Sequence, residues 1–169
     1  NKQETLKLVK RIGAEGFKWK VAGIRAYTVN TEMLKFWKEN GCETVIYGME
    51  SGSPTMLKVM EKKVSLEQNI QALKSTAEAD LGTVIQLVIG MPGETDKTVK
   101  ETLDFLLKTM SYCKKEAQNN IEYKISINYA QALPGTPLYE YAREKKFIGK
   151  DVDSEEQYLL DISDKNAND

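Results

Sequence analysis

Histidine is absent from the sequence and cysteine is scarce, and these shortages limit the chemistry open to the chain. None of the 169 residues is a histidine, and Cys42 and Cys113 are the only cysteines. General base catalysis by histidine, zinc held by histidine and any metal site built on a cysteine cluster are therefore excluded within the chain. Two cysteines far apart in the sequence are typical of buried thiols in a cytoplasmic protein.

Long apolar runs and an excess of charge of one sign are also missing. No stretch approaches the ~20 apolar residues of a membrane span, and the sequence does not open on a signal peptide. The 24 Lys and Arg residues balance 25 Asp and Glu residues, which argues against a dedicated nucleic-acid binder. With 41% hydrophobic and 29% charged residues, the composition is that of a globular cytoplasmic protein without a membrane or nucleic-acid partner.

What the sequence does contain is a regular alternation of strand-like and helix-like segments. Strands are expected at residues 19–25, 44–47, 84–89 and 121–130. Helices are expected at residues 5–12, 32–40, 54–60, 66–77, 99–110 and 137–145, and N-cap signals precede several of them: Asn30, Ser53, Ser65 in a capping box with Gln68, and Thr136. Four strand–helix repeats predict an α/β protein with a parallel sheet, a partial (β/α) barrel of about four βα units.

Side-chain patterns predict which faces of these elements are buried. The long fifth helix places its apolar residues on one stripe, a pattern typical of a buried face: Val99, Leu103, Leu106, Leu107 and Met110. The last strand alternates, so its tyrosine and isoleucine face should pack on helices, and its other face should line the barrel lumen through Lys124, Ser126 and Asn128. The alternative is an edge strand whose polar face is simply solvated.

Polar and glycine-rich loops follow the strands, where functional groups of βα proteins collect. Arg25 follows the first strand, and the other three loops are residues 48–53, 90–95 and 132–137. Their glycines would let the backbone approach a ligand closely, although each loop taken alone is equally an ordinary βα turn with a helix cap. Gln86 is a further candidate, because a polar amide within an apolar strand needs partners.

These motifs, in this order, resemble the second half of a radical S-adenosylmethionine (SAM) enzyme over roughly residues 17–150. Arg25 and the helix running into Gly41-Cys42 resemble the third strand and following helix of that family. Residues 45–53 (VIYGMESGS) match its "GxESGS" motif, and Met60-Glu61-Lys62 resembles the "MxK" that follows. Residues 89–95 (IGMPGET) match "hxGxPGET", and residues 133–139 (LPGTPLY) match "PGTPLY". The motifs are closest to the branch that often carries an N-terminal cobalamin-binding domain.

The resemblance implies a six-stranded partial barrel in which SAM and a [4Fe–4S] cluster meet at the carboxyl ends of the strands. Carried over by motif, Glu50 and Ser51 would face the SAM ribose or amino group, and Arg25 would help to place the SAM carboxylate. The adenine and ribose would be lined by Gln86, Ile89, Gly90, Pro92 and Gly93, with Leu133 near the adenine edge. Cobalamin in an upstream domain is a further expectation.

The family's CxxxCxxC cluster loop is missing from the sequence, as are the first two strands of the barrel. We therefore expect part of a longer enzyme, inactive alone, with residues 1–149 forming the partial barrel and 150–169 a polar tail. The alternatives are a degenerate relative that has lost the chemistry, a non-catalytic βα interaction or ligand-binding module, and, more weakly, an ordinary metabolic barrel. The expected partners are a small-molecule substrate, the missing half of the barrel and a second copy of the chain, unless the helix at residues 5–12 covers the exposed strand edge.

Overall fold

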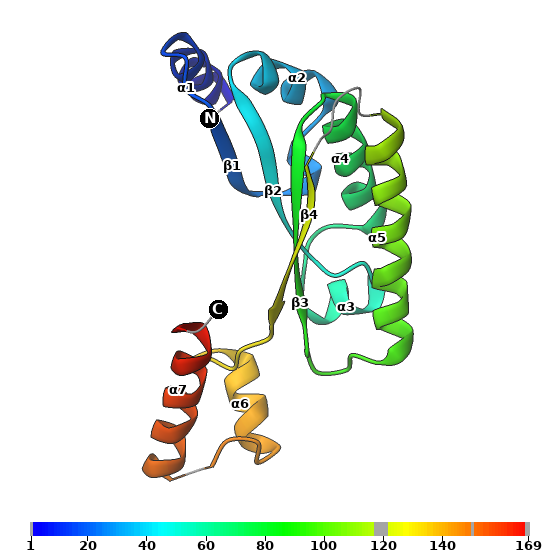
Figure 1. Cartoon of the computed structure of the whole chain (residues 1–169). Coiled ribbons are helices and arrows are strands. Elements are labelled where there is room, and N and C mark those ends of the chain that lie inside the picture. Colours follow the sequence, from blue (N-terminus) through cyan, green and yellow to red (C-terminus); the bar gives the residue numbers. More distant parts are fainter. Residues whose placement is uncertain (1, 117–121, 150, 168–169) are drawn as a thin grey trace. The chain divides into compact units, whose positions relative to one another are not determined.

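The chain forms two compact units, residues 1–128 and 129–169. A computed structural model describes residues 2–116, 122–149 and 151–167 (Figure 1). This division does not coincide with the one expected from composition at residue 149.

A parallel β-sheet organises the first unit. Its strands follow one another in space as they do in sequence, β1 (Trp19–Ile24), β2 (Cys42–Glu50), β3 (Gly82–Ile89) and β4 (Tyr123–Tyr129). Parallel pairing sets Val21 beside Val45 and Ile46 beside Val84. The predicted α/β architecture, a parallel sheet of βα units, is confirmed.

Three helices of the first unit begin where the predicted capping residues Asn30, Ser53 and Ser65 place them. The helices of this unit are α1 (Lys2–Ala14), α2 (Thr31–Glu39), α3 (Pro54–Val59), α4 (Leu66–Glu78) and α5 (Asp96–Glu116), with a 3₁₀ turn η1 (Ala26–Thr28) after β1. Asn30, Ser53 and Ser65 each accept a hydrogen bond from a backbone N–H of the first turn. Ser65 and Gln68 form the complete capping box. Local sequence is therefore sufficient to fix where these helices start.

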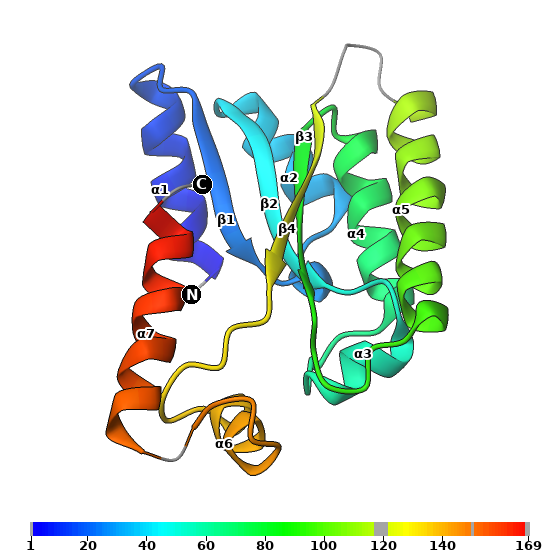
Figure 2. The same cartoon turned by 60° about the horizontal axis from the view of Figure 1, so that its bottom comes forward.

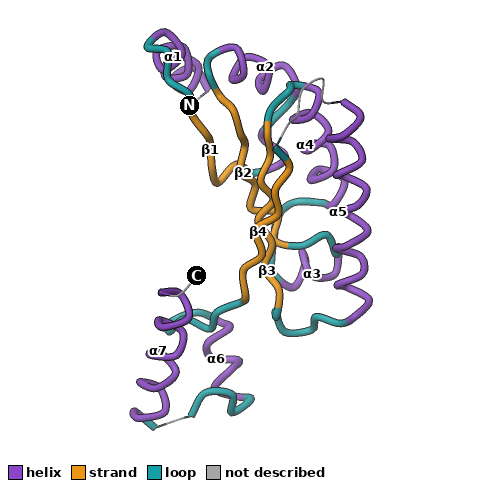
Figure 3. Tube along the Cα trace, viewed as in Figure 1, coloured by secondary structure: helices purple, strands orange, loops and turns teal. Residues whose placement is uncertain are grey.

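The hydrophobic core lies between the sheet and its helices, which cover one face of the sheet (Figures 2 and 3). Alternate residues of the two central strands point into this core, including Val45, Tyr47, Ile85 and Leu87. The Tyr47 hydroxyl reaches the Thr76 hydroxyl of α4 at 2.7 Å. Each strand thus has one face packed on helices, while its remaining side chains emerge on the opposite face.

Two expectations about buried faces are wrong in part. On α5, Leu106 is buried as expected, but Val99, Leu103 and Leu107 are exposed by 41%, 53% and 65%. The helix packs instead through Phe105 and a row of threonines, Thr98, Thr102 and Thr109. Their hydroxyls donate to backbone carbonyls of the same helix or of the turn that precedes it, so these hydroxyl protons need no other acceptor. On β4, some of the residues expected to pack on helices are likewise exposed.

The first residue of β4 packs as expected and the later ones do not. The hydroxyl of Tyr123 lies 2.9 Å from that of Thr109 on α5. Ile125, Ile127 and Tyr129 are exposed, whereas Tyr123 at the start of the strand is partly buried. Ile121, also expected on this face, lies outside the described residues, as does the side chain of Cys113.

The opposite face of the sheet carries no helix among the described residues of the first unit. At its amino end, Glu122 makes ion pairs with Lys20 of β1 at 3.8 Å and with Lys124 of β4. Lys20 and Lys124 lie on the two edge strands, so this charged group bridges the sheet across its open face. This face corresponds to the barrel lumen of the predicted fold, and the placement of Lys124 agrees with the alternation pattern.

The second unit contains α6 (Pro137–Glu144), with Thr136 as its N-cap, and α7 (Val152–Ala167). Residues 150–169 were expected to form a polar tail, but a helix occupies most of them. Tyr158 of α7 lies 6.4 Å from Tyr139 of α6 between ring centroids, and its hydroxyl accepts a hydrogen bond from the backbone N–H of Ala132. Within the described parts of the chain, no helix has the length and apolar character needed to cross a bilayer.

Candidate active site

Glu50 ends β2 in a conformation that non-glycine residues rarely adopt. Its φ is +62°, in the left-handed region, and the pairing of β2 with β3 shifts register between Gly48 and Glu50. A Cβ on Gly48 would lie 3.1 Å from the Glu50 Oε1 atom, so the carboxylate folds back over the open space that glycine leaves. Lys62 Nζ lies 2.8 Å from the same oxygen. The strand therefore presents a charged pair at its carboxyl end.

Gln86 shares the open face with Gly48. The two residues are paired across β2 and β3, and parallel partners point to the same side of a sheet. The neighbours of Gln86, Ile85 and Leu87, are buried on the helix side. The structure thus brings together Glu50, Gly48 and Gln86, which the sequence motifs selected from two separate segments.

Ser51 is buried beneath this surface. It is 2% exposed, its hydroxyl lies 3.1 Å from that of Thr102 on α5, and it accepts a hydrogen bond from the Ser53 backbone N–H. The Gly52 N–H donates to the same Thr102 hydroxyl at 3.1 Å. In this geometry Ser51 fixes the loop that follows Glu50, while a direct ligand contact for Ser51 remains a prediction.

The loop at residues 90–95 is held by its own side chains. Glu94 accepts a hydrogen bond from the Gly90 N–H at 2.7 Å, and Thr95 caps the start of α5 through Thr98. Gly90 and Gly93 have φ values of +84° and +85°, which only glycine adopts readily. Ile89 and Pro92, the other candidates here, are partly exposed, so the loop has accessible surface at the carboxyl end of β3.

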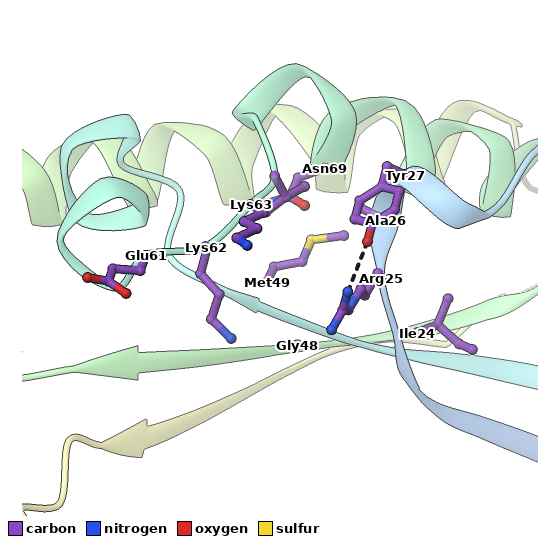
Figure 4. Close-up of a pocket in the computed structure, with 11 residues that line it drawn as sticks. Ile24, Arg25, Ala26, Tyr27, Gly48, Met49, Glu61, Lys62, Lys63 and Asn69 are labelled. Atoms are coloured by element: carbon purple, nitrogen blue, oxygen red, sulfur yellow. Dashed lines mark hydrogen bonds between the residues drawn. The ribbon is translucent and has the colours of Figure 1, made fainter. Parts of the chain in front are cut away.

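Arg25 lies at the mouth of a pocket of about 330 Å³ formed by the ends of β1 and β2 and the connection between α3 and α4 (Figure 4). Its guanidinium donates to the Tyr27 hydroxyl at 3.0 Å, and this hydrogen bond raises the pKa of Arg25. Lys62 and Lys63 line the same pocket. Three cations therefore surround one cavity, which favours an anionic ligand.

Asn69 also lines this pocket and was missed by the sequence analysis. It is 1% exposed, and its Nδ2 has no hydrogen-bond partner among the described residues. In sequence it reads as one more polar residue of the first turns of a helix, and only the fold places it against a cavity. Leu133, the last candidate, belongs to the second unit and is 47% exposed.

Cys42 is the free cysteine that the structure describes, and its surroundings do not suit a metal ligand. It is 1% exposed, and burial raises the pKa of its thiol to about 11. Metal-binding cysteines are thiolates, whereas this thiol stays protonated at neutral pH. No cluster of potential metal ligands occurs in the described part of the chain.

Comparison with known proteins identifies a family. Residues 2–106 match the model described as the Radical SAM superfamily. An uncharacterized methyltransferase of Pyrococcus horikoshii is 34% identical over 144 residues, covering 84% of this chain and 29% of that protein. The anaerobic magnesium-protoporphyrin IX monomethyl ester cyclase of Cereibacter sphaeroides is 32% identical over 71 residues, covering 42% of this chain and 12% of that protein. The chain thus spans under a third of the length of either relative.

Solved structures share the fold. Coproporphyrinogen III oxidase from Escherichia coli, a radical SAM enzyme, superposes with a TM-score of 0.62 at 16% identity, covering 96% of this chain and 36% of that one. The radical SAM methyltransferase TsrM from Kitasatospora setae, with cobalamin and a [4Fe–4S] cluster bound, gives 0.62 at 18% identity, covering 83% of this chain and 26% of that one.

Proposed function

The chain belongs to the radical SAM superfamily, and we propose from this premise that it forms part of the SAM-binding, substrate-facing wall of such an enzyme. The observation that supports this function best is the meeting of Glu50, Gly48 and Gln86 on the open face of the sheet. A carboxylate and an amide at the carboxyl ends of parallel strands offer acceptors and donors where βα proteins bind their ligands.

The residues present suit SAM. The open space over Gly48 and the accessible backbone of the loop at residues 90–95 leave room beside two strand ends. Glu50 would accept hydrogen bonds from ribose hydroxyls or the ammonium group, and Gln86 with residues 89–93 would line the adenine and ribose. Arg25 and Lys62 offer cations to the SAM carboxylate, and the orphaned Asn69 amide in their pocket indicates a missing acceptor.

The [4Fe–4S] cluster of the family has no ligand set among the described residues, because Cys42 is buried and protonated. In family members with the cluster, one-electron cleavage of SAM supplies a 5′-deoxyadenosyl radical that abstracts hydrogen from substrate. In our proposal the cluster loop, and any cobalamin domain, belong to other segments of the enzyme, and the present chain alone is inactive.

The free edge of β1 is the proposed contact for those other segments. Among the described strands β1 pairs only with β2, so its other edge can accept a further strand. In the complete barrel that strand comes from the missing half, and in the isolated chain it comes from a second copy. Light scattering over a concentration series should show a dimer, and a monomeric mass at every concentration would argue against this pairing.

Glu50→Gln tests the SAM site. Replacing the carboxylate with a neutral amide should weaken SAM binding roughly ten- to a hundredfold in isothermal titration calorimetry, the scale of one charge-assisted hydrogen bond. Glu43→Gln, on the same strand but exposed at its other end, is the matched control and should bind SAM as the wild type does. Failure of the wild-type protein to bind SAM would favour the non-catalytic module instead.

A further inference from the structure

The pocket beside Arg25 is built around a buried amide. Asn69 extends from α4 to line a cavity of about 330 Å³, and only 1% of the residue is exposed to solvent. Figure 4 shows it next to Lys63 and above Met49 in this view, among the side chains that line the pocket. A polar group so deeply placed normally finds a hydrogen-bond partner within the protein.

The Nδ2 group of Asn69 has none among the described residues. Burying an amide donor without an acceptor carries its full desolvation penalty, so the site is complete only when something else supplies an acceptor. An acceptor in this cavity would also be close to the cationic side chains. The surroundings of the Nδ2 group therefore suit an acceptor with negative charge.

The charges of the pocket define that acceptor further. Arg25, Lys62 and Lys63 line it against a single acidic residue, Glu61. Lys62 is shared with Glu50 through their 2.8 Å ion pair, yet an ammonium has three donors and retains capacity for another oxygen. A planar anion with two oxygens can meet the amide with one and a cation with the other.

We propose that Asn69 is the floor of a carboxylate-binding pocket, and that its Nδ2 donates to one carboxylate oxygen while Arg25, Lys62 and Lys63 surround the charge. This rests on the proposed function where the carboxylate is that of SAM. The same chemistry would serve a carboxylate of the substrate, and the experiment separates the two sources.

Propionate tests the pocket without reference to SAM. In the ¹⁵N-labelled chain, the side-chain amide signals of Asn69 are assigned by their loss in Asn69→Leu. Titration with sodium propionate should shift them saturably, because a charged acceptor then lies against the Nδ2 group. Sodium chloride at equal ionic strength, and neutral propionamide, should produce no saturable shift. The absence of a propionate response, or an equal response to propionamide, would overturn the proposal.

SAM and its decarboxylated analogue identify the source of the carboxylate. Asn69→Leu should weaken SAM binding about tenfold and leave the decarboxylated analogue unaffected, and Asn69→Asp, which keeps the shape but repels an anion, should weaken SAM further. Trp37→Phe removes another buried N–H without a described partner, away from the pocket, and should change neither affinity. An equal loss for both ligands would mean a packing role and would overturn the proposal.

The two hypotheses fail separately. If propionate shifts the Asn69 amide but the wild-type protein binds no SAM, the proposed function fails and the pocket is assigned to a substrate carboxylate. If Glu50→Gln weakens SAM binding while Asn69→Leu does not, and propionate leaves Asn69 unmoved, the SAM site stands and the carboxylate pocket is wrong.

Discussion

The two faces of the sheet in the first unit differ in burial and in the kind of side chain they carry. On the helix side, Tyr47, Ile85 and Leu87 are almost completely buried, and the one strand hydroxyl among them is paired with α4. On the open side, Gly48 is exposed and Gln86 is partly exposed, and the charged groups lie in pairs near the strand ends. The same strands thus contribute a packed core on one face of the sheet and a surface suited to a ligand on the other.

This contrast separates positions that are constrained by stability from positions that are constrained by function. Substitution on the helix side should be costly to folding because close packing leaves no room for change. Substitution on the open side should cost folding little and binding more, since those side chains have few neighbours within the chain. Four variants, three of them with a comparison variant, test this contrast, chiefly through the free energy of unfolding measured by urea denaturation.

The largest effect should come from Leu73→Ala on α4. Leu73 is fully buried in the core, so truncation should cost about 2–5 kcal/mol through lost burial and the cavity left behind. Val88→Ala on the open face should cost less than about 1 kcal/mol, because that side chain is already partly exposed. Equal losses in the two variants would remove the distinction between the faces.

Gly52→Ala should rank second. A Cβ at this position would lie 2.6 Å from the Cβ of Phe105 and 2.8 Å from the Cα of Thr102, so α5 must move away from the loop. Overpacking of this kind costs about 1–3 kcal/mol. Gly48→Ala is the matched control on the open face, where the new methyl group meets only the end of the flexible Glu50 side chain. A larger loss at Gly48 than at Gly52 would contradict the comparison.

Thr102→Val should have a smaller effect, near 1 kcal/mol. Valine keeps the shape but removes the hydroxyl that contacts Ser51 and accepts from the Gly52 N–H. The Gly52 amide proton should then exchange faster with solvent, and Thr102→Ser should restore its protection. Unchanged exchange in the valine variant would show that α5 does not hold the loop after Glu50.

Gln86→Leu should have the smallest effect on stability, within about 0.5 kcal/mol, because the side chain lies on the open face. SAM affinity, measured by calorimetry, should nevertheless fall, since leucine offers neither a donor nor an acceptor. A strong loss of stability with intact SAM binding would reassign Gln86 to the core and reverse the expected order of the faces.

The sequence predicts the fold better than it predicts the site, for identifiable reasons. Helix starts at Asn30, Ser53 and Ser65 depend on contacts within one turn, so local sequence determines them. The apolar stripe through Leu103 was misplaced because helical spacing reveals a stripe but not which neighbour covers it. Threonines of α5 can be buried because their hydroxyls donate to carbonyls of their own helix or its preceding turn. The amino-acid composition does not show that these hydroxyls are paired in this way.

Within the site, too, the residues that could not be predicted are those whose surroundings depend on contacts far apart in the sequence. Glu50 and Gln86 were found because each follows or interrupts a strong strand pattern. The burial of Ser51 depends on Thr102, far along the chain, and could not be read locally. Asn69 looks like any polar residue near a helix start, and only the three-dimensional packing of α4 against η1 and β3 shows it to be a buried donor without a described partner.

The order of the strands has a consequence for how the molecule assembles. Because β1, β2, β3 and β4 are neighbours in space in the order of synthesis, each βα unit can add to a sheet already formed by the residues before it. Sheet growth of this kind keeps most chain closures short, which favours rapid folding for a parallel protein. The ion pair between Lys20 and Glu122 is different, since it joins the first strand to the approach of the last. It can form only after Glu122, next to the start of β4, has been synthesised, and it therefore accompanies the addition of β4 to the sheet.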